Sequence, residues 1–163
     1  MPGRLADEIK QTKPFANLRQ EVYLNLIRTT DEMAREVEDV LKTVHLSQTQ
    51  YNVLRILRGA GDLGLPCGEI ANRMLTHDPD ITRLVDRLER RGLVLRSRNQ
   101  ADRRVVTVQI TAAGLELIAS LDLDRQMRPA HDRRFATVSD ADCTLLITLL
   151  EQLRLPRPQG TTP

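Results

Sequence analysis

The residues of this sequence with the most distinctive chemistry are arginines clustered in one short stretch. Between positions 83 and 104 there are eight arginines and three acidic residues, an excess of +5 in a 163-residue chain whose formal net charge is +2. The planar guanidinium group binds phosphate oxygens as a bidentate fork, so a basic segment on a slightly acidic body indicates one face that meets a polyanion. The arginines are Arg83, Arg87, Arg90, Arg91, Arg96, Arg98, Arg103 and Arg104.

Motifs for other kinds of chemistry are missing from the sequence. The three histidines lie in unrelated segments, and there is no Ser–His–Asp constellation, HExxH motif or glycine-rich phosphate loop. We therefore expect a protein that is not an enzyme and that has neither a metal nor a cofactor. Cys67 and Cys143 form no CxxC pair. Cys67 is expected to be a helix N-cap, and its place at a helix N-terminus leaves a redox role open.

The composition also bounds the environment of the chain. No apolar run approaches the ~18 residues needed to cross a bilayer, and the N-terminal segment is too polar for a signal peptide. We expect a cytoplasmic protein with no membrane partner. Aromatic residues make up only 2% of the chain, so its core must consist of aliphatic side chains, which suits packed helices.

The spacing of apolar residues predicts the elements that carry the arginines. Intervals of three and four indicate a mainly helical chain, which starts with a long amphipathic helix over 15–44. Ser47 is a good N-cap for the second helix, and a short third helix is expected to start at Cys67. After a basic β-hairpin, Thr111 can cap a further helix, which Pro129 is expected to break.

The order of these elements is that of a winged helix-turn-helix, in which a short helix, a recognition helix and a two-stranded hairpin follow one another. The flanking helices carry more apolar surface than such a small core can cover, so we expect them to bury it in a second copy of the chain. The predicted organisation is a flexible N-terminus (1–14), a helical dimerisation region (15–45 and 112–155), a winged helix-turn-helix DNA-binding domain (46–111) and a disordered tail (156–163).

The predicted recognition helix begins with Asp78 as its N-cap and Pro79 as its first residue. Asp78 and Asp80 argue against a simple phosphate clamp; they could cap the helix, accept from cytosine amino groups or orient Arg83. The alternative is a solvated helix face, with Arg83–Asp86 and Asp86–Arg90 pairs. The residues expected to meet DNA are Asp78, Pro79, Asp80, Thr82, Arg83 and Arg87.

The hairpin is expected to form two strands, 93–98 and 104–110, with a polar loop between them. Arginines on such a projecting wing can reach the minor groove of DNA, whose negative potential deepens where the groove narrows. Asp102 is expected to brace Arg103 or Arg104 in one rotamer, so that replacing either Asp102 or Arg104 with alanine should weaken DNA binding. The predicted wing contacts are Arg96, Arg98, Arg103 and Arg104.

Several segments resemble the MarR family of bacterial transcription regulators. These are LSQTQYNVLRILRGAG, CGEIANRM, ITRLVDRLERRGLV and ADRRVVTVQITAAG. The last contains the Asp-x-Arg signature of the family's wing at Asp102 and Arg104, followed by Ile110, Thr111 and Gly114. The resemblance implies a homodimer with two winged-helix lobes that binds a pseudo-palindromic operator in double-stranded DNA, usually as a repressor released by a small ligand.

The resemblance also implies a cleft for a phenolic or aromatic effector between the dimerisation helices and the winged-helix lobe. Its candidate lining residues in this sequence are Arg19, Tyr23, His45, Tyr51 and Arg55. The segment 77–80 departs from the family's usual Ser, Thr and Arg residues, so the operator sequence cannot be transferred.

Two alternatives stay open at this point. One is an activator of the same family, and the other is a winged-helix dimer that binds proteins in place of DNA. Binding to duplex DNA would separate the second alternative, because release of counterions from phosphates makes affinity fall steeply with salt.

Overall fold

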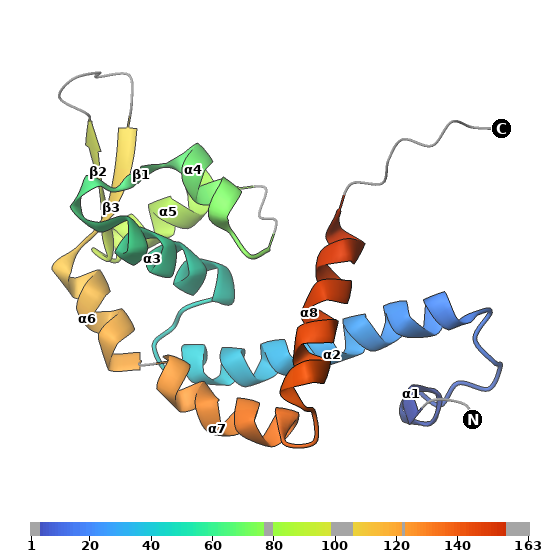
Figure 1. Ribbon diagram of the computed structural model, residues 1–163. Helices are drawn as coiled ribbons and strands as arrows, with labels where there is room; N and C mark the ends of the chain where they lie inside the picture. The colour runs from blue at the N-terminus through green and yellow to red at the C-terminus, as the bar shows by residue number, and fades with distance from the viewer. Residues whose placement is uncertain (1–3, 77–79, 99–105, 122, 156–163) are drawn as a thin grey trace, which may run out of the picture. The chain divides into compact units, whose positions relative to one another are not determined.

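The computed structural model describes residues 4–76, 80–98, 106–121 and 123–155, and the chain divides into two compact units, 1–123 and 124–163. Helices dominate, as predicted, and a small antiparallel sheet belongs to the first unit (Figure 1). Among the described residues, no helix combines the length and apolar character that a membrane span requires. The elements of the first unit are α1 (Arg4–Glu8), α2 (Leu18–Lys42), α3 (Gln48–Ala60), the 3₁₀ helix η1 (Gly61–Leu63), β1 (Leu65–Pro66), α4 (Cys67–Arg73), α5 (Ile81–Arg90), β2 (Val94–Arg98), β3 (Val106–Ile110) and α6 (Ala112–Leu121).

Helix α3 is the centre of the winged-helix lobe, the name used here for the elements from α3 to β3. It packs against α4, α5, α6 and β3 (Figure 1). Val53, Leu54 and Leu57 are fully buried in these contacts. Burial of each such side chain contributes about 2 kcal/mol relative to exposure. Residues from all the neighbouring elements complete this core: Ile70, Val85, Leu88, Val94, Val108 and Ile118.

The predicted cap of α3 is confirmed, and it sits at the junction with α2. Ser47 Oγ accepts from the backbone N–H of Gln50 at 3.1 Å, and the Gln50 side chain accepts from the Ser47 N–H at 3.0 Å. The two contacts form a capping box, which satisfies two N–H groups that lack partners inside the helix. Gln48 then ties α3 to α2 through a 2.6 Å hydrogen bond to the carbonyl oxygen of Ala34.

The sheet has one strand more than the predicted hairpin. Its order is β1-β3-β2, with both pairs antiparallel, so that Leu65 and Arg96 lie on opposite sides of Val108. The sequence did not predict a strand at Leu65–Pro66, because two residues are too few to show an alternating pattern. Pro66 is compatible with an edge strand, where its missing N–H costs no ladder bond.

Two predicted helix starts are shifted by the structure. Pro66 is the N-cap of α4, so Cys67 is the first helical residue and not the cap. Helix α5 starts at Ile81 with Asp80 as its N-cap. The predicted start at Asp78 and Pro79 is therefore too early, and those two residues lie outside the described ranges.

The start of α6 is held close to the sheet, as the expected Thr111 cap requires. Thr111 Oγ1 accepts from the Gly114 N–H at 3.1 Å and donates to the Gly92 carbonyl oxygen at 2.7 Å. A Cβ atom at Gly114 would lie only 2.3 Å from the carbonyl oxygen of Leu93. The close approach of α6 to the strand therefore requires glycine at this position.

The N-terminal segment contains more structure than predicted. Residues 1–14 were expected to be flexible, yet Arg4–Glu8 form helix α1, and Leu5 on it is buried. A cavity of about 310 Å³ lies between α1 and α2, lined mostly by aliphatic side chains. The short helix was missed because five residues show less than two turns of periodicity.

The second unit consists of α7 (Leu123–Phe135) and α8 (Asp140–Arg154). Pro129 lies inside α7, so the prediction that it breaks the helix is wrong. Proline removes a single N–H donor, and the helix continues to Phe135. Ser139 caps α8 by accepting from the Asp142 N–H at 3.1 Å. No residue of α8 is buried within the chain.

Candidate nucleic-acid interface

Helix α5, the predicted recognition helix, has two chemically distinct faces. Ile81, Leu84, Val85 and Leu88 are buried against α3 and α4 and fix the helix in the lobe. The helical repeat turns the remaining positions outward, and Thr82, Arg83 and Arg87 are exposed. The structure therefore brings three of the predicted contact residues together on one accessible surface.

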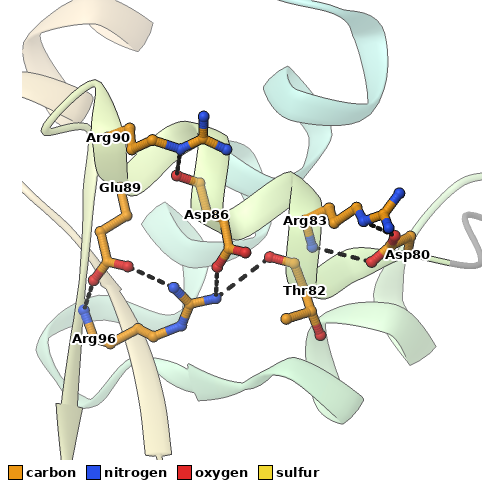
Figure 2. A network of polar contacts seen from close by, with 7 residues as sticks. All are labelled: Asp80, Thr82, Arg83, Asp86, Glu89, Arg90 and Arg96. Atoms are coloured by element: carbon orange, nitrogen blue, oxygen red, sulfur yellow. Dashed lines mark hydrogen bonds and ion pairs between the residues drawn. The ribbon is translucent and has the colours of Figure 1, made fainter.

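The N-terminus of α5 is organised by Asp80. Its Oδ1 accepts from the Arg83 N–H at 3.1 Å, and its Oδ2 lies 3.0 Å from Arg83 Nε (Figure 2). Of the roles considered for this carboxylate, helix capping and orientation of Arg83 are thus both present. Arg83 nevertheless remains 77% exposed, so its guanidinium stays accessible to a phosphate or a base edge.

The pairs expected for a solvated helix face do not form. Arg83 pairs with Asp80, and Arg90 Nε donates to the backbone carbonyl oxygen of Asp86 at 3.3 Å (Figure 2). Arg87 makes no ion pair with another described residue. Asp80, Arg83, Leu84 and Arg87 line a cavity of about 220 Å³. Two cationic side chains thus border a hollow at the start of the helix.

Arg96, predicted to contact DNA from the wing, is turned toward α5. Its Nη1 lies 2.5 Å from Glu89 Oε2 and its Nη2 lies 2.6 Å from Asp86 Oδ1. Nη2 also donates to the Thr82 carbonyl oxygen at 3.3 Å (Figure 2). Only 24% of the Arg96 side chain is exposed. Carboxylates of α5 hold the Arg96 guanidinium, and the predicted contact of Arg96 with DNA stays a prediction.

The electrostatics of this cluster keep Arg96 charged. Desolvation by itself lowers the pKa of the Arg96 guanidinium, but the hydrogen bonds that the guanidinium donates to Asp86 and Glu89 outweigh it and raise the pKa above its ordinary value. The cluster is therefore a cation between two carboxylates. It contributes no free positive charge to the basic surface.

Of the other predicted wing contacts, only Arg98 lies within the described residues. Arg98 is the last residue of β2. Asp102, Arg103 and Arg104 lie outside the described residues, so the brace at Asp102 and the contacts of both arginines stay predictions.

Arg91 has a role that the sequence did not indicate. It stands at the C-cap of α5, and its Nη1 and Nη2 donate to the carbonyl oxygens of His45 and Val44 at 2.6 and 3.0 Å. These carbonyls follow the C-terminus of α2, where a cation is favoured by the helix dipole. No local pattern could reveal the contact, because its partners are 46 and 47 positions away.

The candidate ligand residues fall into separate places in the first unit. Arg19 and Tyr23 are exposed one turn apart on α2. Tyr51 is buried in the core of the lobe, with the Arg55 guanidinium 6.0 Å from its ring centroid. His45 is exposed in the turn after α2 and has a φ of 55°. Tyr51 is therefore a core residue, whereas Arg19 and Tyr23 are both exposed and neighbour each other on α2.

Metal ligands do not cluster in the described part of the chain, where no group of three His, Cys, Asp or Glu side chains could hold an ion. The described part of the site presents the exposed side chains of Arg83 and Arg87 on α5, beside the strands β2 and β3. Such side chains can bind anionic oxygens and base edges.

Comparison with known proteins agrees with this geometry. The family model described as "MarR family" matches residues 46–106. The HTH-type transcriptional regulator MhqR of Bacillus subtilis is 28% identical over 143 residues, covering 85% of this chain and 96% of its own length.

Solved structures extend the likeness over both units. A MarR transcription factor from Planctomyces limnophilus shares 43% sequence identity with a TM-score of 0.61, covering 85% of this chain and 98% of that one. The MepR chain in a solved Staphylococcus aureus MepR–DNA complex shares 20% sequence identity with a TM-score of 0.68, and the match covers 80% of this chain and 93% of that one. At this identity the match shows a shared fold.

Proposed function

Because the chain belongs to the MarR family of transcription regulators, we propose that it binds double-stranded DNA with α5 in the major groove and the β2–β3 wing against the neighbouring minor groove. The observation that carries the proposal is the exposed pair Arg83 and Arg87 on a helix whose opposite face is fully packed. The fold shared with MepR, which was solved in complex with DNA, supports the same assignment.

Arg83 and Arg87 fit the chemistry of the major groove. Arginine can bind guanine O6 and N7 as a bidentate fork or can neutralise a phosphate. Asp80 restricts Arg83 through the 3.0 Å ion pair, so the entropy lost on binding is smaller than for a free side chain. The N-terminus of α5 adds the positive end of a helix dipole next to Arg83.

The proposal includes a homodimer. Helix α2 exposes Leu18, Val22 and Ile27, and α8 exposes a second set of large apolar side chains. Stripes of this kind are rare on a monomer and are typical of helices that bury them in a partner. A homodimer would present two α5 helices to the two halves of a pseudo-palindromic operator.

The proposal also includes regulation by a small aromatic ligand, with repression as its sign. The accessible pair Arg19 and Tyr23 combines a guanidinium and a phenol ring, which suits an aromatic carboxylate. Addition of 4-hydroxybenzoate should then lower DNA affinity, and an Arg19→Ala variant should lose this response. A regulator of transcription acts on the chromosome, so we place the protein in the cytoplasm.

The first experiment measures the fluorescence anisotropy of a labelled duplex from the DNA upstream of the gene, against a shuffled duplex, over a range of salt. We expect tight binding that prefers the native duplex and falls steeply with salt. Arg87→Ala should reduce the slope of log K against log salt by about 1 if Arg87 contacts a phosphate. A lack of binding to both duplexes at low salt would reject DNA binding and favour a protein partner.

A further inference from the structure

The geometry points to Arg96 as a positioning residue, which holds the wing against α5 and sets the rotation of the recognition helix without itself contacting DNA. This inference rests on the proposed DNA binding. It also explains why two acidic residues, Asp86 and Glu89, occur on a helix that is proposed to face DNA: they hold Arg96.

The contacts of Arg96 follow one line along the helix. Thr82, Asp86 and Glu89 are spaced by four and three residues, so they lie on the same face of α5, and the Arg96 guanidinium touches all three (Figure 2). A side chain anchored over nearly two turns resists rotation of the helix about its axis. A single ion pair would not do so.

The same face adjoins the residues proposed to contact DNA. Arg83 and Arg87 each follow one of the anchored positions, Thr82 and Asp86, by one residue. One residue corresponds to about 100° of helix rotation, so fixing the Arg96 face fixes the direction in which Arg83 and Arg87 project. Small errors in that direction would misplace both guanidinium groups at the groove.

Glu89 also holds the strand. Its Oε1 accepts from the backbone N–H of Arg96 at 3.0 Å, while its Oε2 contacts the Arg96 guanidinium. Since β2 is an edge strand, this N–H has no neighbouring strand to bind, and the carboxylate satisfies it. Glu89 therefore joins the recognition helix to the wing through both the backbone and the side chain of one residue.

Two hypotheses about Asp86 and Glu89 predict opposite changes in DNA affinity when these acids are replaced. If the acids affected DNA binding by charge alone, replacing them with amides would tighten binding, since two negative charges near the phosphates would be lost. If they hold Arg96, the same change should weaken binding. The two readings can thus be separated by the sign of one effect.

The test compares Arg96→Ala, Arg96→Lys and the double variant Asp86→Asn/Glu89→Gln with the native protein, using the labelled upstream duplex over a range of salt. We expect Arg96→Ala to weaken binding about tenfold at every salt concentration, the scale of one charge-assisted hydrogen bond, with an unchanged salt slope. Arg96→Lys keeps the charge but not the fork and should lose nearly as much. The double variant should weaken binding as well.

Arg35→Ala is the control, because it breaks the exposed Asp31–Arg35 pair on α2 and should leave affinity unchanged. Circular dichroism establishes that each variant is folded, and a variant that unfolds is replaced in the comparison by Glu89→Gln alone. A salt slope reduced by about 1 in Arg96→Ala would overturn the inference, because that reduction marks a lost phosphate contact. Tighter binding by the double variant would overturn it too. If the native protein binds no duplex, the proposed function itself fails and the inference fails with it.

Discussion

The winged-helix lobe and helix α8 use the same aliphatic residue types, but they differ in where the side chains go. In the lobe, Leu54 and Leu57 of α3 are completely buried by neighbouring elements of the same chain. In α8, Ile147 is 57% exposed, and no residue of the helix is buried. The lobe therefore has a hydrophobic core of its own, whereas the large apolar side chains of α8 stay exposed.

This difference indicates which part of the protein we expect to depend on dimerisation for its stability. A helix that exposes many aliphatic side chains gains little from folding alone, since most helical stability comes from packing of an apolar face. We therefore expect the lobe to keep its structure in a monomer and α8 to lose part of its stability there. The exposed large apolar residues of α8 are Leu145, Leu146, Ile147, Leu149 and Leu153.

The largest expected effect comes from charging the exposed face of α8. The double substitution Leu145→Lys/Leu149→Lys places two cations one turn apart, and it should convert the dimer to a monomer in sedimentation analysis. Loss of two-site attachment should weaken binding to the upstream duplex by roughly 100-fold or more. Glu151→Lys, an exposed position on the same helix, is the control and should remain dimeric. If the double variant stays dimeric, the expectation that α8 packs against a second copy of the chain is wrong.

A smaller effect is expected from Gly114→Ala inside the first unit. The added Cβ would lie 2.3 Å from the Leu93 carbonyl oxygen, so α6 would have to move from the strand. We expect the free energy of unfolding to fall by about 1–3 kcal/mol, measured by urea denaturation. Gly68→Ala, where a Cβ meets nothing within 4 Å, should raise that free energy slightly through helix propensity. Equal effects of the two substitutions would show that the close approach is not required.

The smallest effect compares two helix caps, one in each region. Ser47→Ala removes the cap of α3 and should lower the stability of the lobe by about 1 kcal/mol, independently of protein concentration. Ser139→Ala removes the cap of α8. Its effect on the melting temperature should depend on protein concentration, because α8 is expected to be stable only in the dimer. Identical concentration dependence in both variants would argue that the two regions unfold together.

Local signals in the sequence predicted much of the fold. The caps at Ser47 and Thr111 and the mainly helical character of the chain depend on residues three or four positions apart, and all were confirmed. The exposed arginines of α5 followed from the same periodicity. The strand β1 and the helix α1 were missed because each is shorter than two repeats of the periodicity by which it would be recognised.

The site was predicted less completely than the fold. Arg96 and Arg91 looked like other members of the basic cluster, yet one is held by carboxylates of α5 and the other by carbonyls that follow α2. A count of charges cannot distinguish a cation bound inside the protein from one that faces solvent. Fewer than eight of the arginines between positions 83 and 104 are therefore left without a partner inside the protein.

The sequence by itself determined the order of the helices and the hairpin, the buried face of the recognition helix and the region where positive charge gathers. These depend on neighbours within one or two turns, whose spacing is written in the chain. Only the tertiary structure decided which arginines stay available and why Gly114 must be glycine. Those answers depend on atoms brought together from distant segments, and the energy of such contacts is set by distances that no local pattern contains.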